Sequence, residues 1–386
     1  MAVPHKDRLF PDLKYKAYLN NAAVAPLSKP VRANIQHLME AYGSGGVKGL
    51  IPAMSEKDQL RANLARIINS PVSWIGITPS TTTGLLWIAL EFPWQTGDKL
   101  VLVEGEFPGN IVPWQLAAQH YGLEILWLKP EDLLGPNASL DAVLAQKPKL
   151  MALSWVQYQT GLTVDLAFIS ALGRDHHMAI CLDAIQGLGP MRLDLAQTPI
   201  DFVCCGGHKW LMGPEGCGFV SAAPHWVDRF NPVYEGWLGV ENPIDFLLDG
   251  EGLVNYQKPF RRDSSRVELS TANQLGIAGL RAATDILLEV GLEEVSERAL
   301  AFAHSLRHGL LDLGLPVHTE ATQGAIVSFQ PEPVFGTVRQ IMLAYEQHSV
   351  IGATPDGHLR FSPHFWQEWE EIDLCLEASR QIFNPA

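Results

Sequence analysis

A single lysine, Lys209, lies in the stretch VCCGGHKWLMGPEGCGF, residues 203–219, among residue types that rarely surround a surface lysine. A predicted strand over 201–205 leads into two glycines, so His208 and Lys209 are expected at its carboxyl end. Open α/β sheets bind their ligands at this edge. A partly desolvated lysine there would hold more free amine near neutral pH, and a free amine can condense with a carbonyl group. The alternative is a lysine that reaches solvent from the strand end.

A carboxylate and an amide follow the strand predicted over 178–182. Asp183 and Gln186, in the motif CLDAIQG, precede Lys209 by 26 and 23 residues and should open onto the same sheet edge. A carboxylate at this place can keep a heteroaromatic nitrogen protonated through a charge-assisted hydrogen bond, and the amide can bind a neighbouring hydroxyl. For either residue alone, the capping of a helix N-terminus is the simpler role.

Two further segments supply groups that could bind a phosphate and a flat ring. In ITPSTTTGLLWIAL, residues 77–90, Thr81 and Thr82 open a predicted helix, whose free N–H groups and dipole favour a phosphate. Phe107 follows the predicted strand KLVLV and could stack on a flat ring. An ordinary N-cap and a core aromatic are the respective alternatives.

The order of elements that must position these residues is typical of an α/β fold. Short apolar runs alternate with helix-length segments, which predicts a mostly parallel sheet covered by helices on both faces. We expect a large α/β domain over 19–255 and a smaller α+β domain over 256–386, with residues 1–18 packed on the smaller one. The small domain should contain helices over 273–291 and 293–314, strands near 324–330 and 357–363, and a last helix from Glu368. The predicted strands of the large domain are 99–105, 123–129, 149–156, 178–184, 201–207 and 216–222.

The composition of the chain limits the classes of molecule that it can bind. The chain has 386 residues and a formal net charge of -14 without a basic stripe, which argues against nucleic acid and favours small molecules. Its five cysteines form no disulfide framework, and the first ten residues lack the apolar segment of a signal peptide. No stretch suits a membrane-spanning helix. We therefore expect a cytoplasmic protein without a membrane or metal site, and Asp175, His176 and His177 are expected to form a solvated loop.

Taken together, a phosphate cradle, a stacking ring, a carboxylate and a lysine match pyridoxal 5′-phosphate (PLP). The chain resembles the class V aminotransferase family of fold-type I PLP enzymes, which includes cysteine desulfurases, kynureninase and isopenicillin N epimerase. The resemblance runs from YLNNAAVAPLS, which begins at Tyr18, to the last predicted strand. The order and spacing of DAIQ and GGHKW are its most specific part.

The resemblance implies a role for each matching position. Lys209 would form a Schiff base with the cofactor and later move a proton, while Asp183 would bind the pyridine nitrogen. The other implied cofactor contacts are Gln186 and Tyr158 near the ring hydroxyl, Thr81, Thr82 and His208 at the phosphate, and Phe107 on the ring.

The same resemblance implies contacts to the substrate and to a second subunit. Asn21 and Ala22 match a substrate-side loop. Thr271 matches a threonine that reaches the phosphate of the neighbouring subunit, and Trp237 resembles an aromatic residue that does so in kynureninase. A homodimer with composite active sites is therefore expected.

We expect a small-molecule amino acid or amine as the substrate. The α-carboxylate of an amino acid needs an anchor, and the planar cation of arginine is the usual one. Arg360, in HLRFSPHFW, matches the family's arginine on the last strand, although a solvated strand arginine is equally common. The cluster Arg261, Arg262 and Arg266 is a competing anchor.

Several departures from the family bear on the reaction. Cysteine desulfurases carry a nucleophilic cysteine before the last strand, but HSVIGATPDGH has none, and they place a histidine where Phe107 stands. Cys204 and Cys205 are expected to be inert core thiols. Gly206 replaces a common serine, which removes one phosphate contact. Family resemblance favours an aminotransferase. Epimerisation, β-elimination, kynureninase-like hydrolysis and PLP binding without turnover remain alternatives.

Overall fold

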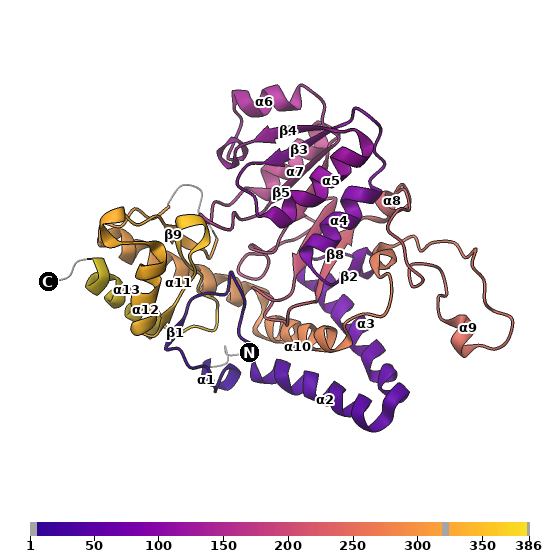
Figure 1. The fold of residues 1–386 in the computed structure, drawn as a ribbon, viewed down its shortest axis with the longest axis horizontal. Coiled ribbons are helices and arrows are strands. Elements are labelled where there is room, and N and C mark those ends of the chain that lie inside the picture. The colour runs from indigo at the N-terminus through magenta and orange to yellow at the C-terminus, as the bar shows by residue number, and fades with distance from the viewer. Residues whose placement is uncertain (1–5, 319–323, 384–386) are drawn as a thin grey trace.

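A seven-stranded sheet forms the centre of the computed structural model, which describes residues 6–318 and 324–383 (Figure 1). Its strand order is β2-β8-β7-β6-β5-β3-β4, and β8 runs antiparallel to both of its neighbours while the other pairs are parallel. The predicted mostly parallel sheet is thus confirmed. The strands are β2 (Ile75–Thr78), β3 (Lys99–Val103), β4 (Glu124–Leu128), β5 (Leu150–Ser154), β6 (Ala179–Asp183), β7 (Phe202–Gly206) and β8 (Gly218–Ala222).

The inner strands are apolar on both faces because helices cover the sheet on both sides. Every residue of β6, β7 and β8 is buried, as expected for strands between two helical layers. The helices up to residue 227 are α1 (Lys6–Leu9), α2 (Lys29–Gly45), α3 (Leu50–Ile67), α4 (Thr81–Glu91), α5 (Val112–Tyr121), α6 (Ala138–Leu144), α7 (Leu166–Asp175) and α8 (Pro224–Val227).

The C-terminal part has the predicted mixture of helices and short strands (Figure 1). Two pairs of strands lie there: β1 (Ala17–Tyr18) with β10 (Val350–Ile351), and β9 (Val327–Phe329) with β11 (Leu359–Phe361). The remaining helices are α9 (Asp245–Leu248), α10 (Gln274–Val290), α11 (Leu292–Asp312), α12 (Val338–Gln347) and α13 (Trp369–Phe383).

The first residues of the chain pack on this C-terminal part. The rings of Phe10 and Trp366 lie 4.4 Å apart, and Lys6 pairs with Glu371 at 3.0 Å. Residues 1–5 of the predicted 1–18 segment lie outside the described residues. Helix α10 packs on α2 and α3 before the chain enters α11, and the division at residue 255 stays a prediction.

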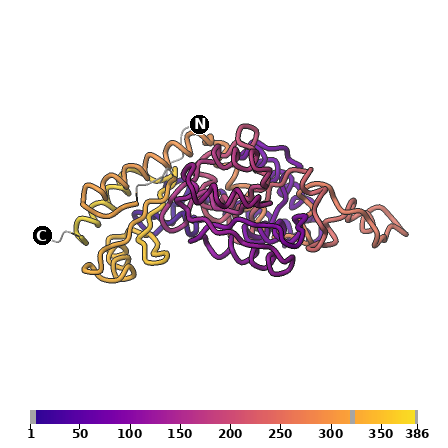
Figure 2. The backbone as a smooth tube through the Cα atoms, turned by 90° about the horizontal axis from the view of Figure 1, so that it is seen from above, coloured from indigo at the N-terminus to yellow at the C-terminus, as the bar shows by residue number. Residues whose placement is uncertain are grey.

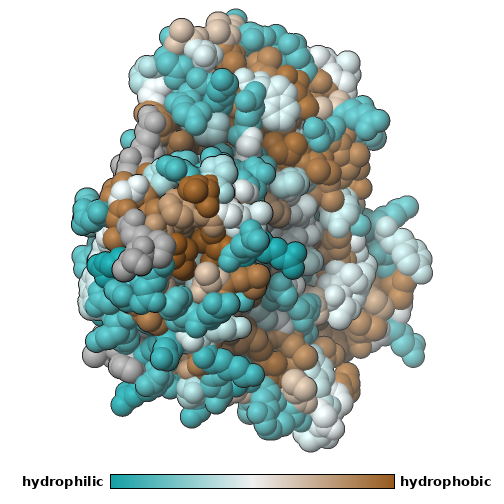
Figure 3. Space-filling model, turned by 60° about the vertical axis from the view of Figure 1, so that its left-hand side comes forward, coloured by the Kyte–Doolittle hydropathy of each residue, from teal (hydrophilic) through white to brown (hydrophobic). Residues whose placement is uncertain are grey.

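An arm, residues 228–263, extends away from the sheet and carries α9 at its far end (Figures 1 and 2). It exposes large apolar side chains, with Tyr256 97% and Leu248 71% exposed. The side of the molecule turned forward in Figure 3 carries both hydrophilic and hydrophobic patches. Across the two described ranges, none of the helices has the length and apolar character needed to cross a bilayer.

Candidate active site

The carboxyl ends of β5, β6 and β7 meet at one edge of the sheet and border a cavity of about 410 Å³. This volume lies in the range of small-molecule sites. The cavity brings together residues from seven segments of the chain. Ten predicted site residues line it: Ala22, Thr81, Thr82, Phe107, Tyr158, Asp183, Gln186, His208, Lys209 and Arg360.

Lys209 follows β7 and presents its amine to this cavity. Burial and the positive charge of Arg360 lower the pKa of Lys209 from 10.5 to about 8, although the carboxylate of Asp183 opposes the shift. The Lys209 Nζ atom lies 5.9 Å from the centre of the Phe107 ring. Near neutral pH, the fraction of molecules with an uncharged Lys209 amine is therefore larger than for an ordinary lysine, as the sequence predicts.

Asp183 is the last residue of β6 and is 5% exposed. Its Oδ1 atom accepts a hydrogen bond of 3.0 Å from the backbone N–H of Ile185. Burial raises the pKa of Asp183 to about 6, against the effects of that hydrogen bond and of Lys209. The carboxylate is largely ionised above neutral pH, and it can hold a proton on a ligand nitrogen.

Gln186 is fixed by two hydrogen bonds. Its Oε1 atom accepts from the Trp210 indole at 3.0 Å, and its Nε2 atom donates to the Ala22 carbonyl at 3.0 Å. The Ala22 N–H donates to the Ser362 hydroxyl at 2.9 Å. Asn21 lies behind this loop, fully buried, and donates to the Ser362 carbonyl. The predicted substrate-side loop thus places Ala22 at the cavity and Asn21 behind it.

Helix α4 begins at the predicted phosphate site. Ser80 caps the helix, and its hydroxyl accepts from the backbone N–H of Thr83 at 3.2 Å. Thr81 and Thr82 form the first turn and line the cavity together with His208. The Thr81 Oγ1 atom is buried without a hydrogen-bond partner. A buried hydroxyl at a helix N-terminus is suited to bind an anion.

Two aromatic residues lie at the mouth of the cavity. Phe107 is 53% exposed, and its ring packs edge-on against Tyr158 with centroids 5.4 Å apart. The hydroxyl of Tyr158 accepts a hydrogen bond of 2.8 Å from Gln159. Burial, together with the nearby charge of Asp356, raises the pKa of Tyr158, so the phenol is neutral at physiological pH.

Of the two candidate substrate anchors, Arg360 alone lines the cavity. Its Nη1 atom donates to the Tyr158 carbonyl at 2.7 Å, while its buried Nε atom has no partner. The competing cluster lies elsewhere: Arg266 is buried between Glu91 and Glu235. The geometry therefore favours Arg360 as the anchor.

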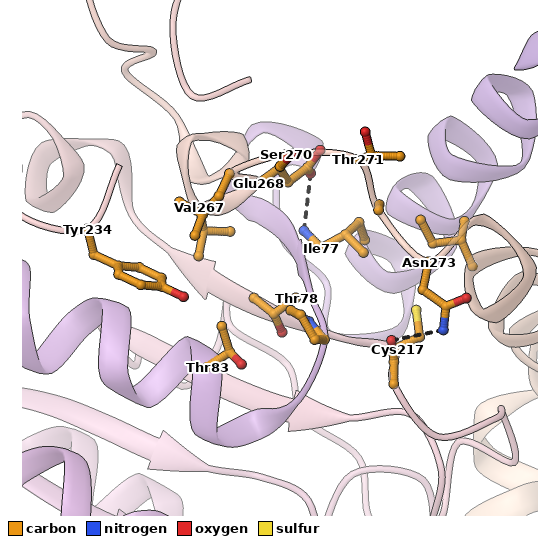
Figure 4. A pocket seen from close by; sticks show the side chains of 15 residues that line it. Ile77, Thr78, Thr83, Cys217, Tyr234, Val267, Glu268, Ser270, Thr271 and Asn273 are labelled. Carbon is orange, nitrogen blue, oxygen red and sulfur yellow. Dashed lines mark hydrogen bonds between the residues drawn. The ribbon is translucent and has the colours of Figure 1, made fainter. Parts of the chain in front are cut away.

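Thr271 and Trp237 do not reach this cavity within one chain. Thr271 lines a separate pocket of about 220 Å³, together with Thr83, Tyr234 and Asn273 (Figure 4). Trp237 lies in the arm, where its indole donates to the Ser270 hydroxyl at 3.1 Å. Their predicted roles at a neighbouring subunit's site remain predictions.

The remaining predicted features lie outside the site. All five cysteines are buried and unpaired, and burial raises the pKa of Cys204 and Cys205 above the usual value. The segment Asp175 to His177 is exposed at the end of α7. Within residues 6–318 and 324–383, no group of three or more His, Cys, Asp or Glu side chains is arranged to hold a metal ion.

Sequence reasoning missed two polar residues beside the cavity, Glu106 and Ser154. The Glu106 carboxylate accepts hydrogen bonds from the Ser154 N–H, at 2.7 Å, and from the Ser154 hydroxyl. Ser154 ends β5 and lines the cavity. The position of Ser154 at a strand end could have indicated a site residue. Glu106 lies in a loop before an aromatic residue, and this pattern indicates no site.

The chain was compared with known protein families, curated proteins and solved structures. Residues 17–350 match the family model described as Aminotransferase class-V. A probable cysteine desulfurase of Pyrococcus abyssi (strain GE5 / Orsay) is 25% identical over 95% of this chain and 94% of its own. A mutant of C-DES with glycine covalently linked to its PLP cofactor has a TM-score of 0.86 at 25% identity, covering 98% of this chain and 99% of its own. The cystine C–S lyase C-DES in complex with its product, cysteine persulfide, has a TM-score of 0.85 at 26% identity, covering 97% and 99%.

The sheet and its helical layers are those of a fold-type I PLP enzyme. The chain belongs to the aminotransferase class-V family. Both the predicted family and the predicted fold class are confirmed.

Proposed function

We propose that this chain is a PLP-dependent enzyme that acts on an amino acid and removes its β-substituent, with a carbon–sulfur bond as the favoured target. Membership of the class V family supports the cofactor. The name of one relative, a probable cysteine desulfurase, and the description of C-DES as a cystine C–S lyase support the reaction. The buried state of all five cysteines is the observation that separates this proposal from desulfuration through a protein thiol.

The residues at the cavity fit PLP. The unpartnered Thr81 hydroxyl and the start of α4 suit its phosphate, the Asp183 carboxylate suits its ring nitrogen, and the Lys209 amine suits its aldehyde. When bound, PLP supplies an aldehyde that condenses with amines and a ring that withdraws electrons from the α-carbon of the substrate.

Lys209 and Asp183 then have complementary proton roles. With a pKa of about 8, the Lys209 Nζ atom can accept a proton from a substrate carbon and return it near neutral pH. Asp183 is buried and mostly ionised near neutral pH, so it would keep the ring nitrogen of bound PLP protonated through a charge-assisted hydrogen bond. The two side chains approach the cavity from adjacent strands, β6 and β7.

Arg360 orients the substrate. Arg360 lines the cavity and is 4% exposed, and its buried Nε atom has no hydrogen-bond partner. A planar cation in this position can bind the α-carboxylate through two parallel hydrogen bonds. Burial lowers the pKa of Arg360 to about 10, which still leaves the group charged at neutral pH.

The fate of the leaving group follows from the cysteines. A persulfide-forming enzyme needs an accessible thiolate, and reactive thiols have lowered pKa values. Here burial raises the pKa of Cys217 to about 12 and that of Cys375 still higher, and residues 348–358 contain no cysteine. The sulfur would therefore leave as part of a small molecule.

The test is a product analysis with L-cysteine, L-cystine and L-alanine. A β-lyase releases pyruvate and ammonia, together with sulfide from cysteine or a persulfide from cystine. The aminotransferase predicted from the sequence would instead form a keto acid without ammonia and convert the cofactor to its amine form. An epimerase would change only the configuration, a kynureninase-like hydrolase would act on kynurenine, and a PLP-binding protein without turnover would give no product. Keto acid without ammonia from every substrate would contradict the proposal.

We also infer that two copies of the chain combine their sites. The position of Thr271 outside its own Lys209 cavity and the exposed apolar surface of the arm support a second subunit. Sedimentation equilibrium should give twice the mass of 42.5 kDa. A monomer that retains full activity would contradict this inference. The cytoplasmic location also remains a prediction.

A further inference from the structure

Glu106 is a carboxyl group that the proposed mechanism does not use, although it accepts hydrogen bonds from Ser154, which lines the cofactor cavity. Its two oxygens accept three hydrogen bonds: two from Ser154, and one from the Asn110 side-chain amide at 3.2 Å. A carboxylate bound by this many donors is fixed in place. Ser154 pairs in register with Asp183 on the neighbouring strand β6. Glu106 is therefore held beside the strand end that carries the proposed partner of the ring nitrogen.

The same carboxylate holds the segment that carries Phe107. Asn110, at the end of the 3₁₀ turn Pro108–Asn110, accepts a hydrogen bond of 3.1 Å from the indole of Trp114 in α5. Gly109 lies so close to α4 that an added Cβ atom would be 2.8 Å from the Thr82 hydroxyl. Glu106 thus joins β5 to a turn that is also packed against α4 and α5.

The negative charge of Asp183 acts on the Glu106 carboxyl group. Burial raises the pKa of Glu106 to about 7, with a contribution from the negative charge of Asp183. Tyr158, a titratable group on which Glu106 acts, has a raised pKa and stays neutral in this range. Lys209, on the far side, acts on Asp183 with a positive charge. Near pH 7, Asp183 is mostly ionised while Glu106 is divided between its two protonation states.

We propose that Glu106 is a positioning residue of the cofactor site, which fixes the Phe107 segment against β5 and places a second ionisable carboxyl group beside Asp183. This inference rests on the proposed function, because it takes PLP as the ligand. A protonated ring nitrogen next to Asp183 favours the charged form of Glu106. Cofactor binding near pH 7 should therefore release a proton from Glu106.

Calorimetric titration of the apoprotein with PLP, in two buffers with different ionisation enthalpies, measures this proton release. Glu106→Gln retains an oxygen that can accept from Ser154 but cannot titrate. It should release about half a proton less than the native protein at pH 7, because a group with a pKa near 7 is about half ionised there. Glu104→Gln is the matched control, since Glu104 lies two residues earlier with an exposed side chain, and it should release as many protons as the native protein.

A second variant separates the hydrogen bonds of Glu106 from its charge. Glu106→Ala removes the hydrogen bonds as well, so it should bind PLP about tenfold more weakly than Glu106→Gln. Equal proton release by the native protein and Glu106→Gln, with equal affinities for both variants, would overturn the inference. If the native protein itself fails to bind PLP, the proposed function fails. Native binding that is indifferent to Glu106 refutes only the positioning role.

Discussion

The lowered pKa of Lys209 predicts how fast the apoprotein captures PLP at each pH. With a pKa of about 8, about a tenth of Lys209 is uncharged at pH 7, compared with about 0.03% of a lysine whose pKa is 10.5. The free amine is the reacting form. Between pH 7 and pH 9 its fraction should rise about tenfold and then level off, whereas that of an ordinary lysine would rise about a hundredfold and continue upward.

The assay is stopped-flow absorbance after mixing the apoprotein with PLP, at pH values from 6 to 10.5. PLP itself titrates in this range, so its own pH dependence must be removed from the measured rates. A small amine that resembles the lysine side chain and has an ordinary pKa is therefore measured at each pH, and its rate is divided by its own free-amine fraction. The rate of the protein is then divided by this reference rate. Lys209→Ala should show no covalent capture at any pH. A corrected rate that continues to rise beyond pH 9.5 would refute the lowered pKa and the burial that causes it.

The remaining predictions concern single substitutions. Asp183→Asn should lower kcat by about 100- to 1,000-fold, because the ring nitrogen loses its charged partner; a change below fivefold in steady-state kinetics would mean that another group protonates the ring. Arg360→Lys should raise KM for the amino acid by about tenfold or more, since the planar fork is lost, and an unchanged KM would remove Arg360 as the anchor. Arg266→Met should lower the free energy of unfolding by about 3–5 kcal/mol in urea titrations, because it leaves two carboxylates in the interior without their partner; a raised KM with unchanged stability would instead restore Arg266 as an anchor. Lys209→Met should stabilise the apoprotein below pH 8 by at most about 3.5 kcal/mol, since the pKa of Lys209 falls from 10.5 to about 8 and each pKa unit corresponds to about 1.4 kcal/mol. In the native apoprotein this cost of burying the charge disappears as the pH rises from about 8 to 10.5, so a stability difference that does not shrink over this range would contradict the prediction. Thr271→Ala should weaken PLP binding although Thr271 lies outside its own chain's cavity, and unchanged binding in equilibrium dialysis would argue against composite sites.

The sequence was sufficient to predict the part of the site that parallel strands build. The sequence places Asp183 and Lys209 at the carboxyl ends of two apolar strands, and the carboxyl ends of parallel strands in one sheet meet at one edge. The structure shows in addition that these strands, β6 and β7, are neighbours. The short strand β2 was not predicted. Its four residues pair with β8, about 140 positions later, and such a pairing leaves little local pattern.

The roles of charged residues depended on tertiary contacts that spacing cannot reveal. The cluster that contains Arg266 was a reasonable substrate anchor until the fold showed its ion pair with Glu91, 175 residues away. Glu106 gave no signal because its partner, Ser154, lies 48 residues further along the chain. Sequence alone also cannot place Thr271, since its predicted contact is with another subunit.

The central claim is that one amine, on Lys209, condenses with PLP at this sheet edge. The most direct measurement is borohydride reduction of the PLP-loaded protein, followed by proteolysis and mass spectrometry of the peptides. A pyridoxyl group on Lys209, absent from Lys209→Ala, is the result expected. A label on a different lysine, or none at all, would contradict the account.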